Sequence, residues 1–312
     1  MRKRNKRLYQ IAATVFLLVC LLISLNEMAQ KPFLPTWDSI FAGAKLDDTT
    51  PLPAGELTIQ MIDVGNADAF LISSKDTHML IDAGERGDGE AVLQTLRERN
   101  ITTLDWVIAT HADADHIGGM QEVVEAVTVN RYMMSFMPKG HTPTTKTYYN
   151  LLAAIDKLDI ALVEATMGYT FPLGDATVEI LGPVKDFEDN NNQSVICCIT
   201  YGKKRFLFMG DAETAAETAL LQSGVDLSAD LLKVGHHGSD TSTTAALLKQ
   251  VRPTIALIPC GEGNKYGHPG RYTLMRLNEM DAAVYRADLH GDVTVRCDGE
   301  SIHVTTEKGE KN

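Results

Sequence analysis

The sequence contains few cysteines and no pattern among them. Five cysteines occur in 312 residues, and no two of them stand in a Cys-x-x-Cys spacing. Cys197 and Cys198 are adjacent. Because neighbours on a strand point to opposite faces of a sheet, we do not expect these two to bond each other. The pattern excludes a disulfide framework and a thiol redox motif, and we expect the cysteines to be small apolar residues of the core.

Positive charge is also scarce. The chain carries 29 Lys and Arg against 41 Asp and Glu, a net charge of −12. Residues 1–10 hold five of the basic residues and no acid, so the remainder carries 24 basic and 41 acidic residues, a balance of −17. General binding of nucleic acid depends on Lys and Arg displacing phosphate counterions. A body this acidic excludes that mode, so any phosphate that it binds must be held locally, by metal.

Long apolar runs are limited to one near the start of the chain. Residues 11–25 are fifteen residues without a charge, directly behind the basic segment. This length lies between that of a signal-peptide core and a full membrane span, and no small-x-small cleavage site follows. We expect residues 1–29 to be an uncleaved anchor in the cell membrane, with its basic end cytoplasmic and the rest of the chain extracellular. If the anchor is cleaved, the rest is secreted.

Residues 30–56 contain four prolines with Thr and Asp between them, which predicts a linker without a core of its own. One folded domain is expected over residues 57–312. The sequence shows no short-period repeat and no low-complexity segment.

Within this domain, two series of elements each begin with strands and continue with strands that alternate with helices. The first series is predicted as strands at 57–64, 69–73, 78–81 and 104–110, with helices at 89–100, 118–127 and 148–158. The second is predicted as strands at 176–181, 194–201, 205–209, 231–234, 254–259, 283–286, 292–296 and 302–306, with helices at 213–223, 243–251 and 272–280. This pattern predicts two mixed sheets face to face with helices outside, and loops that meet at one edge.

The densest group of polar residues follows the predicted strand at 104–110. The sequence THADADHIGG at residues 110–119 supplies two histidines and two carboxylates within six residues: His111, Asp113, Asp115 and His116. At this density the four groups would repel and desolvate one another without a cation. Imidazole and carboxylate without thiolate are ligands for a borderline cation such as zinc or manganese.

Three later segments also follow a predicted strand with a polar group. They contain Asp211 after Gly210, the adjacent pair His236 and His237, and His268. Taken singly, each is typical of a turn or of the start of a helix. Taken together, they bring imidazole and carboxylate to corresponding edges of the predicted sheets, so we interpret them and residues 111–116 as one metal site.

These motifs resemble those of the metallo-β-lactamase fold. The matching segments are Asp82-Ala83-Gly84, the HxDxDH motif of 111–116, Asn191-Asn192-Gln193-Ser194, Gly210-Asp211, the HHGS motif of 236–239 and Tyr266-Gly267-His268-Pro269. Within that fold they are similar to the metallohydrolase domain of the DNA-uptake protein ComEC and to its membrane-anchored single-domain relatives. The resemblance covers residues 57–300. It implies an α/β, four-layer αββα sandwich behind the N-terminal anchor.

The resemblance also implies a centre of one or two Zn²⁺ ions, or of Mn²⁺. The implied ligands are His111 and Asp113 at a first metal, Asp115, His116 and His237 at a second, and Asp211 as the bridge. Asp82 is expected behind the ligands, where it orients one of them. One ligand departs from the pattern, because residues 190–194 are NNNQS where the superfamily has a histidine. Water, Asn191 or a harder ion such as Mn²⁺ would complete this position, or His141 would reach it from a distant loop.

Hydrolysis of a phosphodiester is the chemistry that this centre implies. Two cations that share Asp211 would lower the pKa of a bound water and bind the anionic oxygens of the substrate. We expect Asp115 to orient the hydroxide, and His268 or His236 to protonate the leaving group. The expected substrate contacts are Lys233, Asn264, Tyr266 and Asn191.

The sequence therefore predicts an exported, metal-dependent phosphodiesterase or nuclease of the ComEC type, with DNA as a candidate substrate and the membrane as the partner of the N-terminal helix. Two alternatives stay open. One is a hydrolase of a small or cell-wall-linked substrate, such as a phosphorylcholine ester, a lactone or a β-lactam, which the lack of a basic surface favours. The other is a degenerate module that binds without turnover, which the absent histidine favours.

Overall fold

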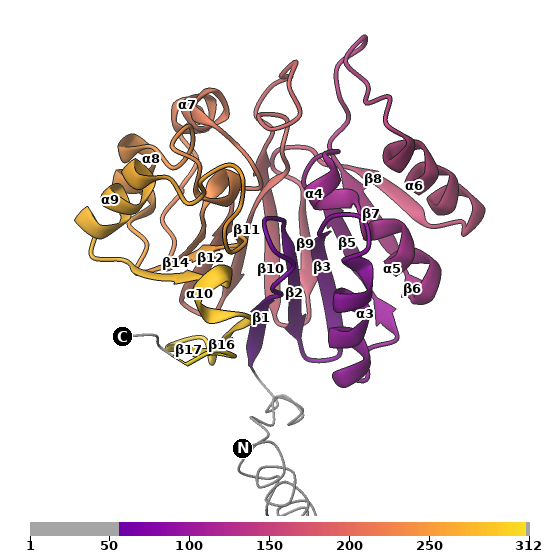
Figure 1. Cartoon of the computed structure of the whole chain (residues 1–312), viewed down its shortest axis with the longest axis horizontal. Helices are drawn as coiled ribbons and strands as arrows, with labels where there is room; N and C mark the ends of the chain where they lie inside the picture. The colour runs from indigo at the N-terminus through magenta and orange to yellow at the C-terminus, as the bar shows by residue number, and fades with distance from the viewer. Residues whose placement is uncertain (1–55, 310–312) are drawn as a thin grey trace, which may run out of the picture. The chain divides into compact units, whose positions relative to one another are not determined.

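Two β-sheets pack face to face in the computed structural model, which describes residues 56–309 (Figure 1). The first sheet contains, in spatial order, β17 (Ile302–Thr306), β16 (Val293–Cys297), β1 (Leu57–Met61), β2 (Ala69–Ser74), β3 (Thr77–Ala83), β5 (Trp106–Ala109), β7 (Arg131–Met134) and β8 (Ala161–Glu164). The second contains β15 (Ala283–Arg286), β14 (Ile255–Ile258), β13 (Leu231–Lys233), β12 (Lys204–Phe208), β11 (Ile196–Tyr201), β10 (Ala176–Gly182) and β9 (Thr170–Leu173). A separate parallel pair joins β4 (Thr103–Leu104) and β6 (Thr128–Val129).

Helices cover the outer face of each sheet, as Figure 1 shows. The first sheet packs against α3 (Gly89–Glu98), α4 (Ala114–Ile117), α5 (Met120–Ala126) and α6 (Lys146–Lys157). The second packs against α7 (Thr214–Ser223), α8 (Ala245–Val251) and α9 (Arg271–Glu279). The short 3-10 helix η1 (Gly235–Gly238) follows β13, and α10 (Ala287–His290) follows β15. The predicted order of helix, sheet, sheet and helix is confirmed.

The central strands are buried on both faces. In β2, Phe70 belongs to the core between the sheets, whereas its neighbour Leu71 packs under the helices. In β12, Phe208 lies in the same central core and Leu207 lies under the helices of the second sheet. The rings of Phe70 and Phe208 meet edge to face, 5.4 Å between centroids. Burial on both faces explains why these strands are apolar almost throughout their length.

Most predicted elements are present, but the sequence does not indicate β7, β8 and β9. β8 is a four-residue strand at a sheet edge and is largely exposed, although three of its residues are apolar. β9 contains Pro172, which ordinarily counts against a strand and is tolerated here because β9 is also an edge strand. The strand predicted at 104–110 is divided at Asp105, whose carboxylate accepts a hydrogen bond from the amide of His78 (2.9 Å).

The cysteines of the described residues are buried and free of disulfides, so their predicted place in the core is confirmed. Burial raises the pKa of the Cys260 thiol to about 12. The predicted anchor at 1–29 and all but the last residue of the predicted linker lie outside the described residues. Among residues 56–309, no helix combines the length and the apolar character that a membrane span requires.

Candidate metal centre

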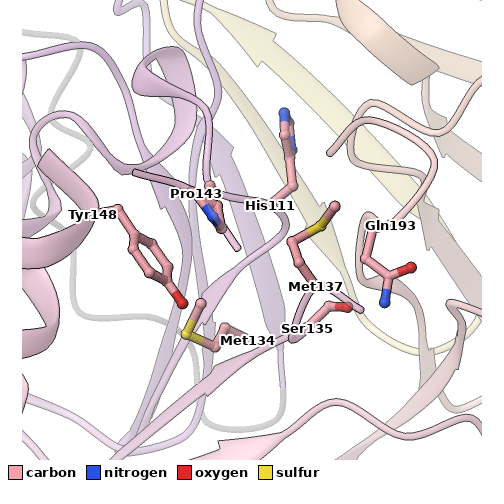
Figure 2. Close-up of a pocket in the computed structure, with 8 residues that line it drawn as sticks. His111, Met134, Ser135, Met137, Pro143, Tyr148 and Gln193 are labelled. Atoms are coloured by element: carbon pink, nitrogen blue, oxygen red, sulfur yellow. The ribbon is translucent and has the colours of Figure 1, made fainter. Parts of the chain in front are cut away.

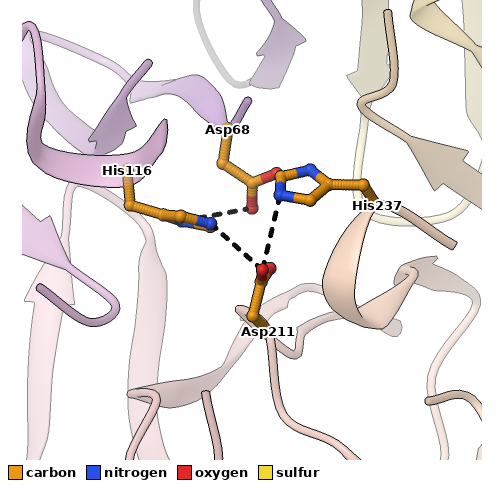
Figure 3. Close-up of side chains that lie close together, drawn as sticks. All are labelled: Asp68, His116, Asp211 and His237. Atoms are coloured by element: carbon orange, nitrogen blue, oxygen red, sulfur yellow. Dashed lines mark ion pairs between the residues drawn. The ribbon is translucent and has the colours of Figure 1, made fainter. Parts of the chain in front are cut away.

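Four loops at one edge of the two sheets carry the polar side chains of the centre (Figure 3). One loop precedes β2, and the others follow β5, β12 and β13. The last three leave the carboxyl ends of buried strands, an edge where α/β folds commonly bind ligands. The segment after β5 includes the single helical turn α4, which carries Asp115 and His116.

The backbone adopts unusual conformations to bring these side chains together. Gly210 has φ +53°, and a Cβ there would lie 2.9 Å from the Cβ of Ser194 and 3.0 Å from that of Thr110. His236 and His237 have φ of 48° and 52°, in the left-handed region that residues with a Cβ rarely adopt. Such strain costs about 1–3 kcal/mol per residue and is concentrated at functional sites.

His116, His237 and Asp211 direct their ligand atoms at one another from different elements (Figure 3). Oδ2 of Asp211 lies 3.3 Å from Nε2 of His116 and 3.4 Å from Nε2 of His237. Asp115 adds Oδ2, which lies 3.3 Å from Nε2 of His237. Ligand atoms about 2.0–2.1 Å from a tetrahedral ion lie about 3.3–3.4 Å from one another. These spacings fit one divalent ion held by the four side chains.

The Nε2 atoms of three buried histidines at the centre make no hydrogen bond with the described residues. Nε2 of His116, of His237 and of His111 is buried, without a hydrogen bond among the described residues. A buried polar atom without a partner costs about 1–3 kcal/mol, so such atoms are uncommon unless a ligand satisfies them. Three of them in adjacent loops are what a metal site requires.

The opposite edges of the two buried histidines are held by the protein. Nδ1 of His116 lies 2.8 Å from Oδ2 of Asp82, and Nδ1 of His237 lies 3.0 Å from the carbonyl oxygen of Pro259. Asp82 also accepts hydrogen bonds from the backbone N and the hydroxyl of Thr110 (2.8 and 2.6 Å). Asp82 thus lies behind the ligands, where a carboxylate fixes the ring so that Nε2 faces the metal position.

The sequence analysis missed Asp68, which lies in the turn before β2. Its carboxylate is buried, with Oδ1 3.2 Å from Nδ1 of His237 and Oδ2 3.9 Å from Nδ1 of His116. Asp68, His116, Asp211 and His237 form a cluster whose ligand atoms all lie within 4.8 Å of one another. Because Asp68 faces Nδ1 atoms that Asp82 and Pro259 already hold, we interpret it as a support of the ligands. The only signal in the sequence is a carboxylate directly before a buried strand.

Two expected substrate contacts lie elsewhere in the site. Lys233 is 1% exposed, and its ammonium donates to the carbonyl oxygen of Gly210 (2.8 Å) and pairs with Asp68, so the expectation that it contacts substrate is wrong. Asn264 braces its own loop. Its amide donates to the carbonyl oxygen of His268 (2.6 Å), and its side-chain oxygen accepts from the backbone N of the same residue (3.0 Å).

The position expected for the first metal is less complete. Nε2 of His111 lies 3.6 Å from Oδ2 of Asp113, and the His111 ring lies 4.0 Å from that of His116 between centroids. Asn190 donates its amide to Oδ1 of Asp113 (2.7 Å). Asn191 lines the adjoining cavity, whereas His141 is exposed on a loop and does not line it. This position offers one imidazole and one carboxylate, with Asn191 as the remaining side chain.

Opposite charges shift the pKa values of the centre strongly. Burial opposes ionisation of Asp115, but the neighbouring His237 and His116 outweigh burial and lower its pKa to about 2. Burial likewise opposes ionisation of Asp211, yet His237 and His116 hold its pKa well below the usual value. The pKa values of these two histidines are raised well above normal, because the charge of Asp211 outweighs their burial. In the metal-free protein these histidines therefore carry protons that a metal ion would displace.

A cavity of about 310 Å³ opens above the centre. Its lining residues are Asn66, Asp113, Ala114, Asp115, Asn191, Asp211, His236, His237, Tyr266 and His268. None of these residues is Lys or Arg. At the rim, the exposed ring of Tyr266 stacks on His268 at 5.6 Å between centroids, and His268 stacks in turn on His237 at 6.4 Å. A column of three rings thus runs from the surface to a candidate ligand.

The two histidines proposed as proton donors differ in their surroundings. Nδ1 of His236 lies 2.9 Å from Oε1 of Glu213, and its Nε2 lies 3.8 Å from Oδ2 of Asp211. Burial and the charges of His236 and His237 lower the pKa of His268. His268 is thus neutral near pH 7, while His236 is held by a carboxylate and directed at the centre.

A second pocket lies on the far side of His111, and Figure 2 shows the side chains that line it. They include Met134, Met137, Pro143 and Tyr148, which make it largely apolar. Its volume of about 10 Å³ is close to that of a single water probe. The larger cavity is therefore the one that can hold a substrate.

The model of the Metallo-beta-lactamase superfamily matches residues 62–262, which is most of the described chain. The chain belongs to this superfamily. It is 31% identical over 265 residues to ComE operon protein 3 of Bacillus subtilis, covering 79% of this chain and 34% of that protein. It is 30% identical over 243 residues to Recombination protein 2 of Haemophilus influenzae, covering 76% of this chain and 28% of that protein. The chain thus spans about a third of the length of these ComEC-type relatives.

Solved structures show the same fold at low sequence identity. A mutant of the β-hydroxylase CmlA matches with a TM-score of 0.50 and 14% identity, covering 80% of this chain and 55% of that one. The superfamily and the candidate centre together support a metal-dependent hydrolase with a ComEC-like domain.

Proposed function

We propose that this protein is a metal-dependent phosphodiesterase of the nuclease type that uses a metal-activated water. One observation carries the proposal: the carboxylate of Asp211 and the unpartnered Nε2 of His237 line a cavity that no described Lys or Arg lines, and the unpartnered Nε2 of His116 lies behind them, 3.3 Å from Asp211. An anionic substrate in such a cavity needs a cation for its charge, and divalent ions supply it. Zn²⁺ and Mn²⁺ both accept these ligands.

His116, His237, Asp211 and Asp115 would hold one ion, and His111, Asp113 and Asn191 would contribute to a second, with Asp211 between them. A bound ion would supply a nucleophilic water at neutral pH and polarise the phosphoryl oxygen. Asp115, ionised at any working pH, accepts a hydrogen bond from the attacking water and so orients it. Its side chain is 27% exposed, which leaves it accessible from the cavity.

His236 is better placed than His268 to protonate the leaving group. The contact of His236 Nδ1 with Oε1 of Glu213 fixes the ring so that Nε2 faces the centre, 3.8 Å from Oδ2 of Asp211, and Thr241 fixes Glu213 by a hydrogen bond to the same oxygen (2.8 Å). His268 is neutral near pH 7 because burial lowers its pKa, so it serves as a hydrogen-bond partner or a stacking surface. Tyr266 extends that surface to the rim, where a nucleobase would lie.

DNA is the substrate that we propose, with residues 1–29 holding the domain outside the cell membrane. The name of one relative, Recombination protein 2, refers to recombination and supports DNA. The test measures turnover of bis(p-nitrophenyl) phosphate and of labelled single- and double-stranded DNA by the full-length chain with Mn²⁺ or Zn²⁺. We expect cleavage of both substrate types, and only a shallow loss of DNA affinity as salt rises, because no described Lys or Arg lines the cavity to displace phosphate counterions. Asp211→Asn should abolish turnover, whereas Asp230→Asn, which alters an ion pair with Lys204 far along the sheet, should not.

Turnover of the small diester without cleavage of DNA would overturn the nuclease assignment. It would favour the second candidate, a hydrolase of a small or cell-wall-linked substrate, which the lack of Lys and Arg in the cavity lining supports. Full metal occupancy without any turnover would instead identify a binding module.

A further inference from the structure

Lys233 is a lysine buried in the floor of the metal centre. It ends β13, and its side chain is 1% exposed. Its ammonium pairs with Oδ2 of Asp68, lies 3.5 Å from Oδ1 of Asp211, and donates to the carbonyl oxygen of Gly210 at 2.8 Å. Lysine is almost never fully buried unless it is paired, and here every partner belongs to the centre or to its support.

The two oxygens of Asp211 face different partners. Oδ1 lies on the Lys233 side, whereas Oδ2 lies 3.3–3.4 Å from the Nε2 atoms of His116 and His237. A carboxylate that could rotate would offer either oxygen in several orientations. The cation attracts Oδ1 by charge at 3.5 Å, without a hydrogen bond, and so favours the rotation that presents Oδ2 to the metal position.

Asp68 links the same cation to both histidines. One oxygen of Asp68 pairs with Lys233, and the carboxylate lies 3.2 Å from Nδ1 of His237 and 3.9 Å from Nδ1 of His116. Asp82 adds a further fully buried carboxylate behind His116. Three buried carboxylates thus lie around one permanent cation, and its removal would leave the cluster one positive charge short until a metal ion binds.

We propose that Lys233 is a positioning residue that serves as the resident cation of the centre. It holds the carboxylates of Asp68 and Asp211 in position before a metal ion binds. Oδ2 of Asp211 stays available to the metal. A lysine with a purely structural role would stabilise the metal-free and the metal-loaded protein equally. A resident cation matters mainly when metal is absent, because the metal supplies the missing charge. The inference rests on the proposed metal position and not on the proposed substrate.

The test compares thermal unfolding of the full-length chain after chelation and after loading with Zn²⁺ or Mn²⁺, and the metal retained after dialysis. In Lys233→Met, we expect the melting temperature of the metal-free protein to fall by about 10 °C or more. The melting temperature of the metal-loaded variant should fall by less than half of that amount. Metal loading should therefore raise the melting temperature more in the variant than in wild type. In Asp68→Asn/Lys233→Met, which removes both charges of the pair, the shift should return toward the wild-type value.

Lys204→Met is the matched control, because Lys204 makes an ion pair with Asp230 at 2.9 Å in the same sheet, away from the centre. It should lower both melting temperatures equally. Equal losses in metal-free and loaded Lys233→Met would overturn the proposal, as would failure of both Lys233 variants to fold even with metal. If metal does not raise the melting temperature of the wild-type protein, the proposed metal position itself is wrong. If the melting temperatures and metal retention are as expected but the protein has no phosphodiesterase activity, the role of Lys233 stands and only the proposed function is overturned.

Discussion

Nδ1 of His116 lies 2.8 Å from Oδ2 of Asp82, and both side chains are completely buried. This contact determines which nitrogen of His116 faces Asp211. It also ties α4 to the end of β3, because Asp82 holds Thr110 by two further hydrogen bonds. One carboxylate therefore sets the orientation of a candidate ligand and the path of the loop that carries it.

Replacing Asp82 with Asn should weaken metal binding about 10–100-fold, the usual effect of removing a carboxylate behind a histidine ligand. Titration against a zinc-binding dye measures the dissociation constant. Asp105→Asn is the control, because Asp105 also accepts a backbone hydrogen bond, from His78, but near the start of β5. If both variants bind zinc as tightly as wild type, Asp82 does not orient a ligand.

Asn191→His should complete the first metal position. Asn191 lines the cavity beside Asp113, and Nε2 of His111 is unpartnered at that end of the centre. A second imidazole nitrogen beside His111 and Asp113 would convert a weak position into a zinc site of the usual donor set. Elemental analysis after dialysis should show about one additional zinc per chain. Asn66→His places a histidine elsewhere in the lining of the same cavity and should add none.

The sequence predicts the part of the centre that follows from strand ends. His116, Asp211 and His237 follow strands buried on both faces, and such strands are recognisable as apolar runs that stop at polar residues. Because a buried strand is recognisable as an apolar run, a polar residue directly after it can be identified as a candidate for the site. The same logic identified the two sheets and their covering helices.

The positions of Asp68 and Lys233 could not be predicted in this way. A carboxylate in a turn before a strand is ordinary in sequence, and only the pairing of distant segments reveals that Asp68 lies behind two histidines. Lys233 stands at the end of the apolar β13, where its charge suggests an exposed contact, yet it is buried. The partners that make its burial tolerable come from the turn before β2 and the loop after β12, and their proximity is a property of the fold. The edge strand β8 was missed for another reason, because its three apolar residues form too short a run to identify a strand.

Metal affinity should increase with pH. The pKa values of His116 and His237 are raised well above normal, because the charge of Asp211 outweighs burial, so both rings hold protons that the metal must displace. We expect up to about tenfold tighter binding per pH unit for each proton released. Calorimetry in buffers of different ionisation enthalpy counts these protons. Binding without proton release between pH 6 and 8 would contradict the raised pKa values.

The stability of the metal-free protein should change in the opposite direction. A histidine with a raised pKa in the folded state contributes stability that is complete below about pH 6.5. That contribution is lost as pH rises through the raised value. Urea unfolding of the chelated protein should therefore show falling stability above neutral pH, and metal loading should abolish this trend.

Gly210→Ala should destabilise the fold by about 2–4 kcal/mol, because strain and steric overlap add. Gly210 has φ +53°, and a Cβ would lie 2.9 Å from that of Ser194. Gly224 has a comparable φ of +76° with nothing within 4 Å of the added Cβ, so Gly224→Ala measures the strain alone. Urea unfolding should give about 1 kcal/mol for that control. Equal losses in the two variants would show that the loop relaxes around the new methyl group.

Tyr266→Ala should distinguish DNA from a small diester as substrate. The ring of Tyr266 is 58% exposed at the cavity rim and stacks on His268, so its loss removes a surface for a nucleobase without touching the candidate ligands. Stacking of a base on an aromatic side chain contributes about 1–3 kcal/mol, so kcat/KM for single-stranded DNA should fall about tenfold. Hydrolysis of bis(p-nitrophenyl) phosphate should change less than twofold.

Tyr272→Ala provides the control, because Tyr272 is 64% exposed on α9 and does not line the cavity. It should leave both reactions unchanged. A parallel loss of both activities in Tyr266→Ala would mean that the ring acts through His268 and the centre rather than on a base. Since His268 also stacks on His237, retained zinc affinity in the Tyr266 variant is the measurement that separates these two explanations.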